Sequence, residues 1–164
     1  MRELTSADCP PPGPADHRRG PDEGIPVVFY ADFTCPDCAV AAERLKQSGA
    51  LVHFRHMAIS SRHRRAVPLA AASEAAAAQG CFWPFHDALF ADPGRTDDPH
   101  LWRLCEELGI STSRFDTDRR SRPTLDLVAS QTSEALRAGA VSTPSFLVRG
   151  RLVTSLPDDL ARRA

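Results

Sequence analysis

The chain has 164 residues, 42% of them hydrophobic, and a formal net charge of −1 at pH 7. This size and balance are typical of one domain with a buried core, and the near-zero charge argues against a general nucleic-acid-binding protein. No apolar run approaches the roughly 20 residues that span a bilayer, so we expect neither a membrane span nor a membrane partner.

Residues 1–24 are rich in proline, glycine and charge, which cannot bury a core, so we expect disorder or an extended cover. The stretch from Met1 to Glu23 has no apolar segment of the kind found in secretory signals. This predicts a cytoplasmic protein, unless a signal has already been removed. Cys9 lies in this segment, and we interpret it as an exposed, incidental cysteine rather than a regulatory thiol.

The most informative stretch is an apolar strand from Val27 that leads directly into Cys35 and Cys38, which are separated by two residues. An alanine-rich helical pattern follows at residues 39–47. A Cys-x-x-Cys pair at a strand-to-helix junction is typical of a thioredoxin-like redox centre.

The order of the residues assigns a role to each cysteine. Pro36 is suited to the first helical position, which makes Cys35 the expected N-cap. Unpaired backbone N–H groups and the helix dipole there favour a thiolate, so Cys35 is the expected nucleophile. Cys38 lies one turn further on, where it can resolve a mixed disulfide, whereas the carboxylate of Asp37 opposes thiolate formation.

A zinc site and a static disulfide are the two other uses of such a cysteine pair. A zinc site would need two further ligands, yet Cys9, Cys81 and Cys105 each stand alone in the sequence. A static disulfide is unusual in a chain without an export signal. Redox chemistry is therefore the favoured interpretation.

The stretch Leu51–Ile59 predicts a second strand of a mixed sheet that is covered on both faces. His53 and His56 in it can act as ligands or proton carriers, although strand histidines without a chemical role are commoner. The basic stretch 60–65 is either a solvated loop or a contact for an anionic group of a substrate, and we favour the loop.

Residues 66–139 predict an all-helical block whose helices are delimited by proline and glycine. We expect Cys81 and Cys105 inside it to be small buried hydrophobic residues. The expected helices cover 68–80, 85–90, 98–109 with Asp98 as N-cap, a short turn capped by Ser111, and a long helix after Ser121 with Leu125, Val128, Thr132 and Leu136 on one face.

An apolar strand follows Thr143 and Pro144, and the turn at Arg149 and Gly150 makes the end of the chain an expected antiparallel hairpin. A short helix is expected from Pro157.

With these motifs in place, the chain resembles DsbA-like thioredoxin-fold proteins over roughly residues 25–160. The resemblance implies an α/β fold: a thioredoxin-like mixed β-sheet with an all-helical insertion. Residues 25–65 would be the first half of the core, 66–139 the insertion and 140–164 the second half. The matching motifs are Asp32–Cys38, His63, Ala71–Gly80, Phe82–Trp83, His86–Phe90, Leu108–Ile110 with Phe115, and Ser142–Phe146.

The resemblance also implies roles outside the cysteine pair. Pro144 matches a cis-proline that faces the cysteines, and Thr143 would offer backbone groups to an extended substrate peptide. One departure is Phe29, which occupies the position where thioredoxins carry a buried acid. Asp32 and His63 are the candidates for proton transfer in its place.

The implied activity is that of a thiol–disulfide oxidoreductase acting on protein or peptide thiols, without a metal or a bound organic cofactor. Without an export signal, the family's intracellular branch fits better, with a low-molecular-weight thiol or a reductase as electron partner. Two alternatives stay open: a binding module on the same scaffold, and a protein that binds a soft metal ion through Cys35, Cys38 and a histidine.

Overall fold

The structure is a computed structural model that describes residues 9–160, in which a five-stranded mixed sheet has the order β1-β3-β2-β4-β5. β2 and β3 are parallel and are connected by a helix, whereas all the other neighbouring strands are antiparallel. The strands are β1 (His17–Arg19), β2 (Pro26–Ala31), β3 (Leu51–His56), β4 (Ser145–Val148) and β5 (Arg151–Val153).

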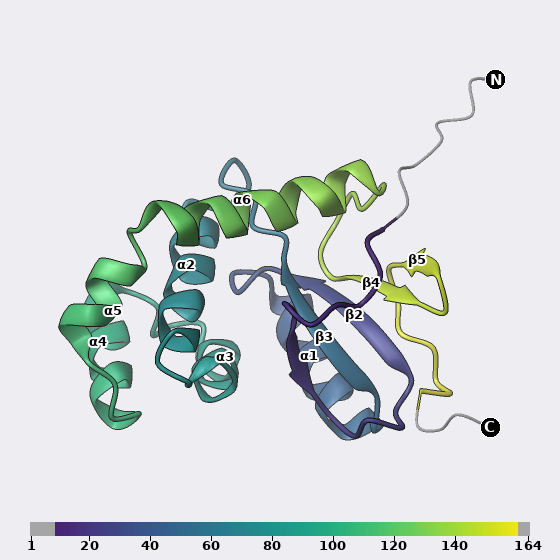
Figure 1. Ribbon diagram of the computed structural model, residues 1–164, viewed down its shortest axis with the longest axis horizontal. Helices are drawn as coiled ribbons and strands as arrows, with labels where there is room; N and C mark the ends of the chain where they lie inside the picture. Colours follow the sequence, from purple (N-terminus) through teal and green to yellow (C-terminus); the bar gives the residue numbers. More distant parts are fainter. Residues whose placement is uncertain (1–8, 161–164) are drawn as a thin grey trace.

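One helix follows β2, and five helices are inserted between β3 and β4, as Figure 1 shows. In that view α1 lies behind the sheet, and α6 extends along the top from the helical block towards the sheet. This arrangement confirms the predicted fold class. The helices are α1 (Pro36–Ser48), α2 (Ala66–Ala77), α3 (Phe82–Ala91), α4 (Asp98–Glu107), α5 (Thr112–Asp118) and α6 (Arg122–Arg137).

The core of the sheet is aromatic and is centred on Phe29 of β2. Its ring stacks on Phe146 of β4 at 5.4 Å and meets Phe54 of β3 edge-on at 5.8 Å. These residues are direct register partners across the three central strands, so their rings share one face. All six residues of β3 are buried, as expected for a strand covered on both faces, although β3 ends at His56 rather than at Ile59.

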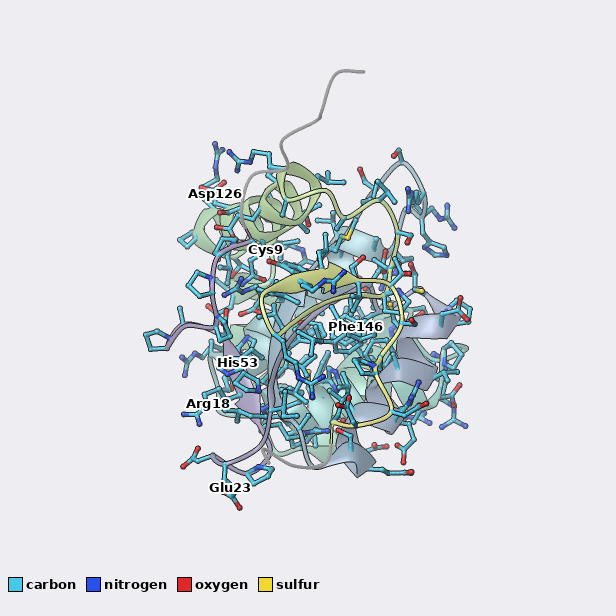
Figure 2. All side chains as sticks on the ribbon, turned by 90° about the vertical axis from the view of Figure 1, so that its right-hand side faces the viewer. Cys9, Arg18, Glu23, His53, Asp126 and Phe146 are labelled. Atoms are coloured by element: carbon cyan, nitrogen blue, oxygen red, sulfur yellow. The ribbon has the colours of Figure 1, made fainter. Side chains whose placement is uncertain are left out.

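From Cys9 onward the N-terminal segment lies along the sheet and supplies strand β1, which the sequence analysis did not predict. Figure 2 shows Cys9, Arg18 and Glu23 along this segment, with His53 of β3 beside it. Arg55 holds the segment by donating to Asp16 at 2.7 Å and to the carbonyl oxygens of Pro10 and Pro11, each at 2.7 Å. The expected disorder or extended cover of residues 1–8 lies outside the described residues.

The helix starts differ from prediction in a consistent way. α2 and α3 each begin two residues before their prolines, Pro68 and Pro84. Asp97, rather than Asp98, caps α4 by accepting the backbone N–H of His100 at 3.1 Å, so Pro99 is its second residue. Proline is tolerated throughout a first turn because those N–H groups have no partner within the helix, so proline alone does not fix the first residue.

The predicted apolar face of α6 is partly wrong. Val128 is buried, but Leu125 is 37% exposed and Leu136 is 48% exposed, while Ala135 is the buried residue near the C-terminal end. Thr132 is a polar contact instead, because its hydroxyl accepts the backbone N–H of Ala58 at 3.0 Å. The helix α6 reaches from the helical block to the sheet (Figure 1), so only some of the residues on its predicted apolar face pack against another element.

Cys105 is buried as predicted, whereas Cys81 is only half-buried at the N-cap of α3. The helix expected from Pro157 is absent as far as the described residues extend, where 158–160 form a turn.

Candidate redox site

The cysteine pair occupies the junction between β2 and α1. Cys35 is the N-cap of α1 with an extended backbone, and Pro36 is the first helical residue, as the sequence predicts. The Cys35 backbone N–H donates to the Asp32 carbonyl oxygen at 3.1 Å and so closes a tight turn after the strand. Cys35 is half-buried, whereas Cys38 is fully buried.

The pKa values of the two thiols are shifted in opposite directions. The pKa of Cys35 is lowered to about 6, mainly by a hydrogen bond from the Cys38 thiol, which acts against burial and is helped by the Thr143 side chain and backbone N–H groups. The same hydrogen bond, together with burial, raises the pKa of Cys38 well above its usual range. Near neutral pH, Cys35 is therefore mainly a thiolate and Cys38 remains a thiol.

Asp37 contributes to the site through its backbone. Its side chain is exposed, and its backbone N–H is among the groups that lower the pKa of Cys35. The Cys38 hydrogen bond, with the Thr143 contact and the backbone N–H groups, therefore lowers the pKa of Cys35 beside this carboxylate.

A loop from the other end of the chain closes the site. The Thr143–Pro144 peptide bond is cis, and the sulfur of Cys35 lies 3.5 Å from the backbone oxygen of Thr143. The hydroxyl of Ser145 donates to the Ser142 carbonyl oxygen at 2.6 Å and fixes the loop where β4 begins. The fold thus brings the predicted Thr143 and Pro144 against the predicted cysteine.

The two residues suggested for proton transfer have other contacts. The Asp32 carboxylate is buried and accepts the backbone N–H of Thr34 at 2.8 Å and its hydroxyl at 2.7 Å, so it stabilises the turn before Cys35. His63 is exposed, and its Nδ1 accepts the backbone N–H of Arg65 at 3.1 Å. These contacts belong to local turns and do not link either side chain to a sulfur.

Sequence analysis missed a buried ionic cluster on the same side of the sheet. The Glu74 carboxylate of α2 contacts His56 Nε2 at 2.7 Å and His17 Nε2 at 2.8 Å. Burial opposes ionisation, but the two histidines lower the pKa of Glu74 to about 2. The ring of Phe33, two residues before Cys35, lies 6.2 Å from that of His56. The sequence offered two signals, the strand residue His56 and a single glutamate within the alanine run of α2, but nothing that paired them.

Within residues 9–160 there is no group of three or more histidine, cysteine, aspartate or glutamate side chains arranged to hold a metal ion. No helix among these residues is long and apolar enough to cross a membrane.

Comparison with curated proteins finds relatives that are much longer than this chain. The Na(+)/H(+) antiporter NhaA of Herminiimonas arsenicoxydans is 38% identical over 149 residues, which cover 87% of this chain but 24% of that protein. Na(+)/H(+) antiporter NhaA 3 of Salinispora tropica is 34% identical over 142 residues, which cover 83% of this chain and 22% of that protein. The chain spans about a quarter of the length of the curated relatives it matches.

Solved structures match over most of their length. A thioredoxin-like oxidoreductase from Silicibacter pomeroyi superposes with a TM-score of 0.77 at 25% identity, covering 90% of this chain and 87% of that one. The thiol-disulfide exchange protein α-DsbA2 from Wolbachia pipientis gives a TM-score of 0.74 at 16% identity, covering 86% and 80%, which shows the shared fold.

The family described as DSBA-like thioredoxin domain matches residues 49–162, a stretch that begins after the cysteine pair and includes the loop of Thr143 and Pro144. The chain therefore belongs to the family of DSBA-like thioredoxin domains.

Proposed function

We propose that this protein is a thiol–disulfide oxidoreductase that uses Cys35 and Cys38 as its redox pair. The observation that carries the proposal is the position of the Cys35 sulfur at the N-cap of α1, 3.5 Å from the Thr143 backbone oxygen. Membership of the DSBA-like family supports the same class of chemistry.

The exchange follows from the two different thiols. The Cys35 thiolate attacks one sulfur of a substrate disulfide and forms a mixed disulfide, and the other substrate sulfur leaves as a thiolate. Cys38 then gives up its proton, attacks the sulfur of Cys35 and releases the second substrate thiolate. The substrate disulfide gains two electrons and the Cys38 proton, any second proton comes from solvent, and the two cysteines become a disulfide. The reverse sequence oxidises a substrate dithiol.

We further propose that the substrates are protein or peptide thiols that approach along the loop of Thr143 and Pro144. This reaction would take place in the cytoplasm, where thiols are kept reduced. A low-molecular-weight thiol or a partner reductase would then supply electrons, with no metal or bound organic cofactor in the cycle.

The experiment equilibrates the protein in graded glutathione redox buffers, alkylates free thiols and reads Cys35 and Cys38 by mass. We expect one reversible two-electron transition confined to this pair. Its midpoint gives the direction of electron flow, because about 30 mV corresponds to a tenfold change in equilibrium constant. Absence of a transition would exclude the oxidoreductase.

A matched pair of variants separates this proposal from the alternatives. Cys35→Ser should abolish turnover of a disulfide substrate without loss of the fold, whereas Cys105→Ser should retain turnover. A binding module would still capture its partner after Cys35→Ser. A soft-metal protein would carry stoichiometric metal after purification, and it would need a third ligand from outside residues 9–160.

The names of the curated relatives suggest one partner class, and we propose that the domain exchanges thiols with a membrane cation antiporter. Its support is that relatives named as Na(+)/H(+) antiporters contain a segment up to 38% identical to this chain. This would revise the expectation of no membrane partner. Cys38→Ser should accumulate the mixed disulfide, so an antiporter should be cross-linked to that variant and absent from the double variant that also carries Cys35→Ser.

A further inference from the structure

A cavity in the helical block lies outside the redox site. It has a volume of about 290 Å³, and its walls come from the start of α2, the start of α4, the end of α5 and the first turns of α6. Figure 1 shows α6 lying across the top of α2, with α4 and α5 beside it. None of the residues that line the cavity belongs to 32–38 or 142–144, so a ligand there would not contact the cysteines.

The charged lining is mainly positive. Arg65, Arg119 and Arg120 face the cavity together with one carboxylate, Asp98. Arg119 is buried and binds Asp98 through two hydrogen bonds of 2.9 and 3.0 Å. These bonds lower the pKa of Asp98 and keep it ionised, so its charge is already balanced by Arg119. The remaining two arginines give the cavity its excess positive charge.

Both of these arginines have capacity for a ligand. Arg120 is 62% exposed in its side chain, where one guanidinium N–H donates to the Asp116 backbone oxygen at 3.2 Å and the Asp116 carboxylate lies 3.8 Å away, so most of its donors face solvent. Arg65 lies 3.5 Å from Asp98, and its buried Nε has no hydrogen-bond partner among the described residues. A buried guanidinium N–H without a partner costs free energy, and a shift of the Arg65 side chain on binding would let an anion satisfy it.

The backbone adds to the positive potential. Arg65 is the N-cap of α2, and its side chain does not cap the helix. Val67, in the first turn of this 12-residue helix, lines the cavity, so the positive end of the helix dipole lies at its wall.

Part of the lining is apolar. Val67 and Pro68 face the cavity from α2, and Leu125, which is 37% exposed, faces it from α6. This leucine is one of the residues that the predicted apolar face of α6 would have buried, and the cavity accounts for its exposure. A bare inorganic anion would leave this wall in contact with water.

We propose that this cavity binds a small organic anion, in which a phosphate or carboxylate group contacts Arg65 and Arg120 and a short apolar body packs on Leu125. The basic stretch 60–65 would thus have a binding role beyond that of a solvated loop. The volume is at the lower end for ligand pockets, which restricts the ligand to a small molecule.

The experiment titrates the full chain with phenyl phosphate by calorimetry, with inorganic phosphate and benzyl alcohol as the anion-only and apolar-only probes. We expect saturable binding of phenyl phosphate at a dissociation constant of about 1 mM or lower, with weaker binding of both partial probes. Arg120→Glu should weaken binding by about tenfold or more, because it removes a charge-assisted hydrogen bond and adds repulsion. Arg103→Glu, an exposed charge reversal on α4 outside the cavity, should leave binding unchanged.

A second variant, Leu125→Asp, tests the apolar half. Its added charge should weaken the binding of both anions, and the loss of the apolar contact should weaken phenyl phosphate binding by a larger factor than inorganic phosphate binding. Three results would overturn the proposal. These are no saturable binding of phenyl phosphate, equal binding by Arg120→Glu, or a partial probe that binds as tightly as phenyl phosphate.

Discussion

The sulfur of Cys35 lies 3.5 Å from the backbone oxygen of Thr143, so the first half of the fold contributes the nucleophile and the second half the surface that faces it. The cis peptide bond between Thr143 and Pro144 is in this loop. Because Cys38 is fully buried behind Cys35, a substrate sulfur can reach only the first cysteine from solvent. In the proposed exchange, this geometry makes Cys35 the attacking cysteine and Cys38 the resolving one.

The first prediction concerns the pH dependence of Cys35. Its pKa is lowered to about 6, so the thiolate fraction should rise as the pH increases through that value. In the reduced protein, the rate of alkylation of Cys35 should therefore reach half of its plateau near pH 6. Cys38→Ala removes the hydrogen bond that lowers this pKa most, and should move the midpoint upward. Alkylation quenched at set times and followed by mass spectrometry measures both midpoints. An unchanged midpoint in Cys38→Ala would contradict the claim that the Cys38 hydrogen bond lowers the pKa of Cys35.

The second prediction concerns the hydroxyl of Thr143. Because the Thr143 side chain lowers the pKa of Cys35, Thr143→Val should raise it while keeping the shape of the side chain. A hydrogen bond contributes about 1 kcal/mol, so the rise should be up to about one pH unit. Ser142→Ala, which changes the same loop without that contact, is the control. Thiolate absorbance near 240 nm as a function of pH reports the change.

The strand, the cysteine pair and the N-cap could be predicted because they depend on local rules. Pro36 fixes the start of α1, and a helix start determines which backbone N–H groups face Cys35. The opposing effect expected of the Asp37 carboxylate stays a prediction, since the pKa of Cys35 is lowered by its hydrogen bonds all the same.

Long-range pairing could not be predicted from those rules. Strand β1 has only three residues, of sequence His-Arg-Arg, with no apolar alternation to mark it. It forms because β3 offers a free edge and Arg55 binds the preceding segment through Asp16. Without β1, the position of His17 and hence the ionic cluster around Glu74 had no basis in the sequence.

The third prediction tests the residue that replaces the buried acid of thioredoxins. Phe29 is 1% exposed and packs between Phe54 and Phe146, so Phe29→Ala should destabilise the protein by about 3–5 kcal/mol. Val40→Ala, which truncates a side chain that is 70% exposed, should change stability by less than about 0.5 kcal/mol. Urea unfolding followed by circular dichroism compares the two. Similar midpoints would show that Phe29 is not central to the core.

The last prediction concerns the cluster of Glu74, His17 and His56. The pKa of Glu74 is lowered to about 2 in the folded protein, below its value of about 4.5 in the unfolded chain. A lowered carboxyl pKa contributes stability that is complete above the unfolded value and is lost as the pH falls through the folded value. Glu74 should therefore stabilise the fold at neutral pH, and this contribution should disappear between about pH 4.5 and pH 2.

Glu74→Ala leaves both histidines without their carboxylate and should cost about 2–4 kcal/mol at pH 7. The difference between the variant and the parent protein should shrink at pH 3, because the parent has by then lost part of the contribution. Glu106→Ala, an exposed glutamate on α4, is the control and should be near neutral at both pH values. Urea unfolding at pH 7 and pH 3 measures the difference. If the cost of Glu74→Ala were the same at both pH values, the ionised carboxylate would not be its cause, and loss of packing in α2 would explain it.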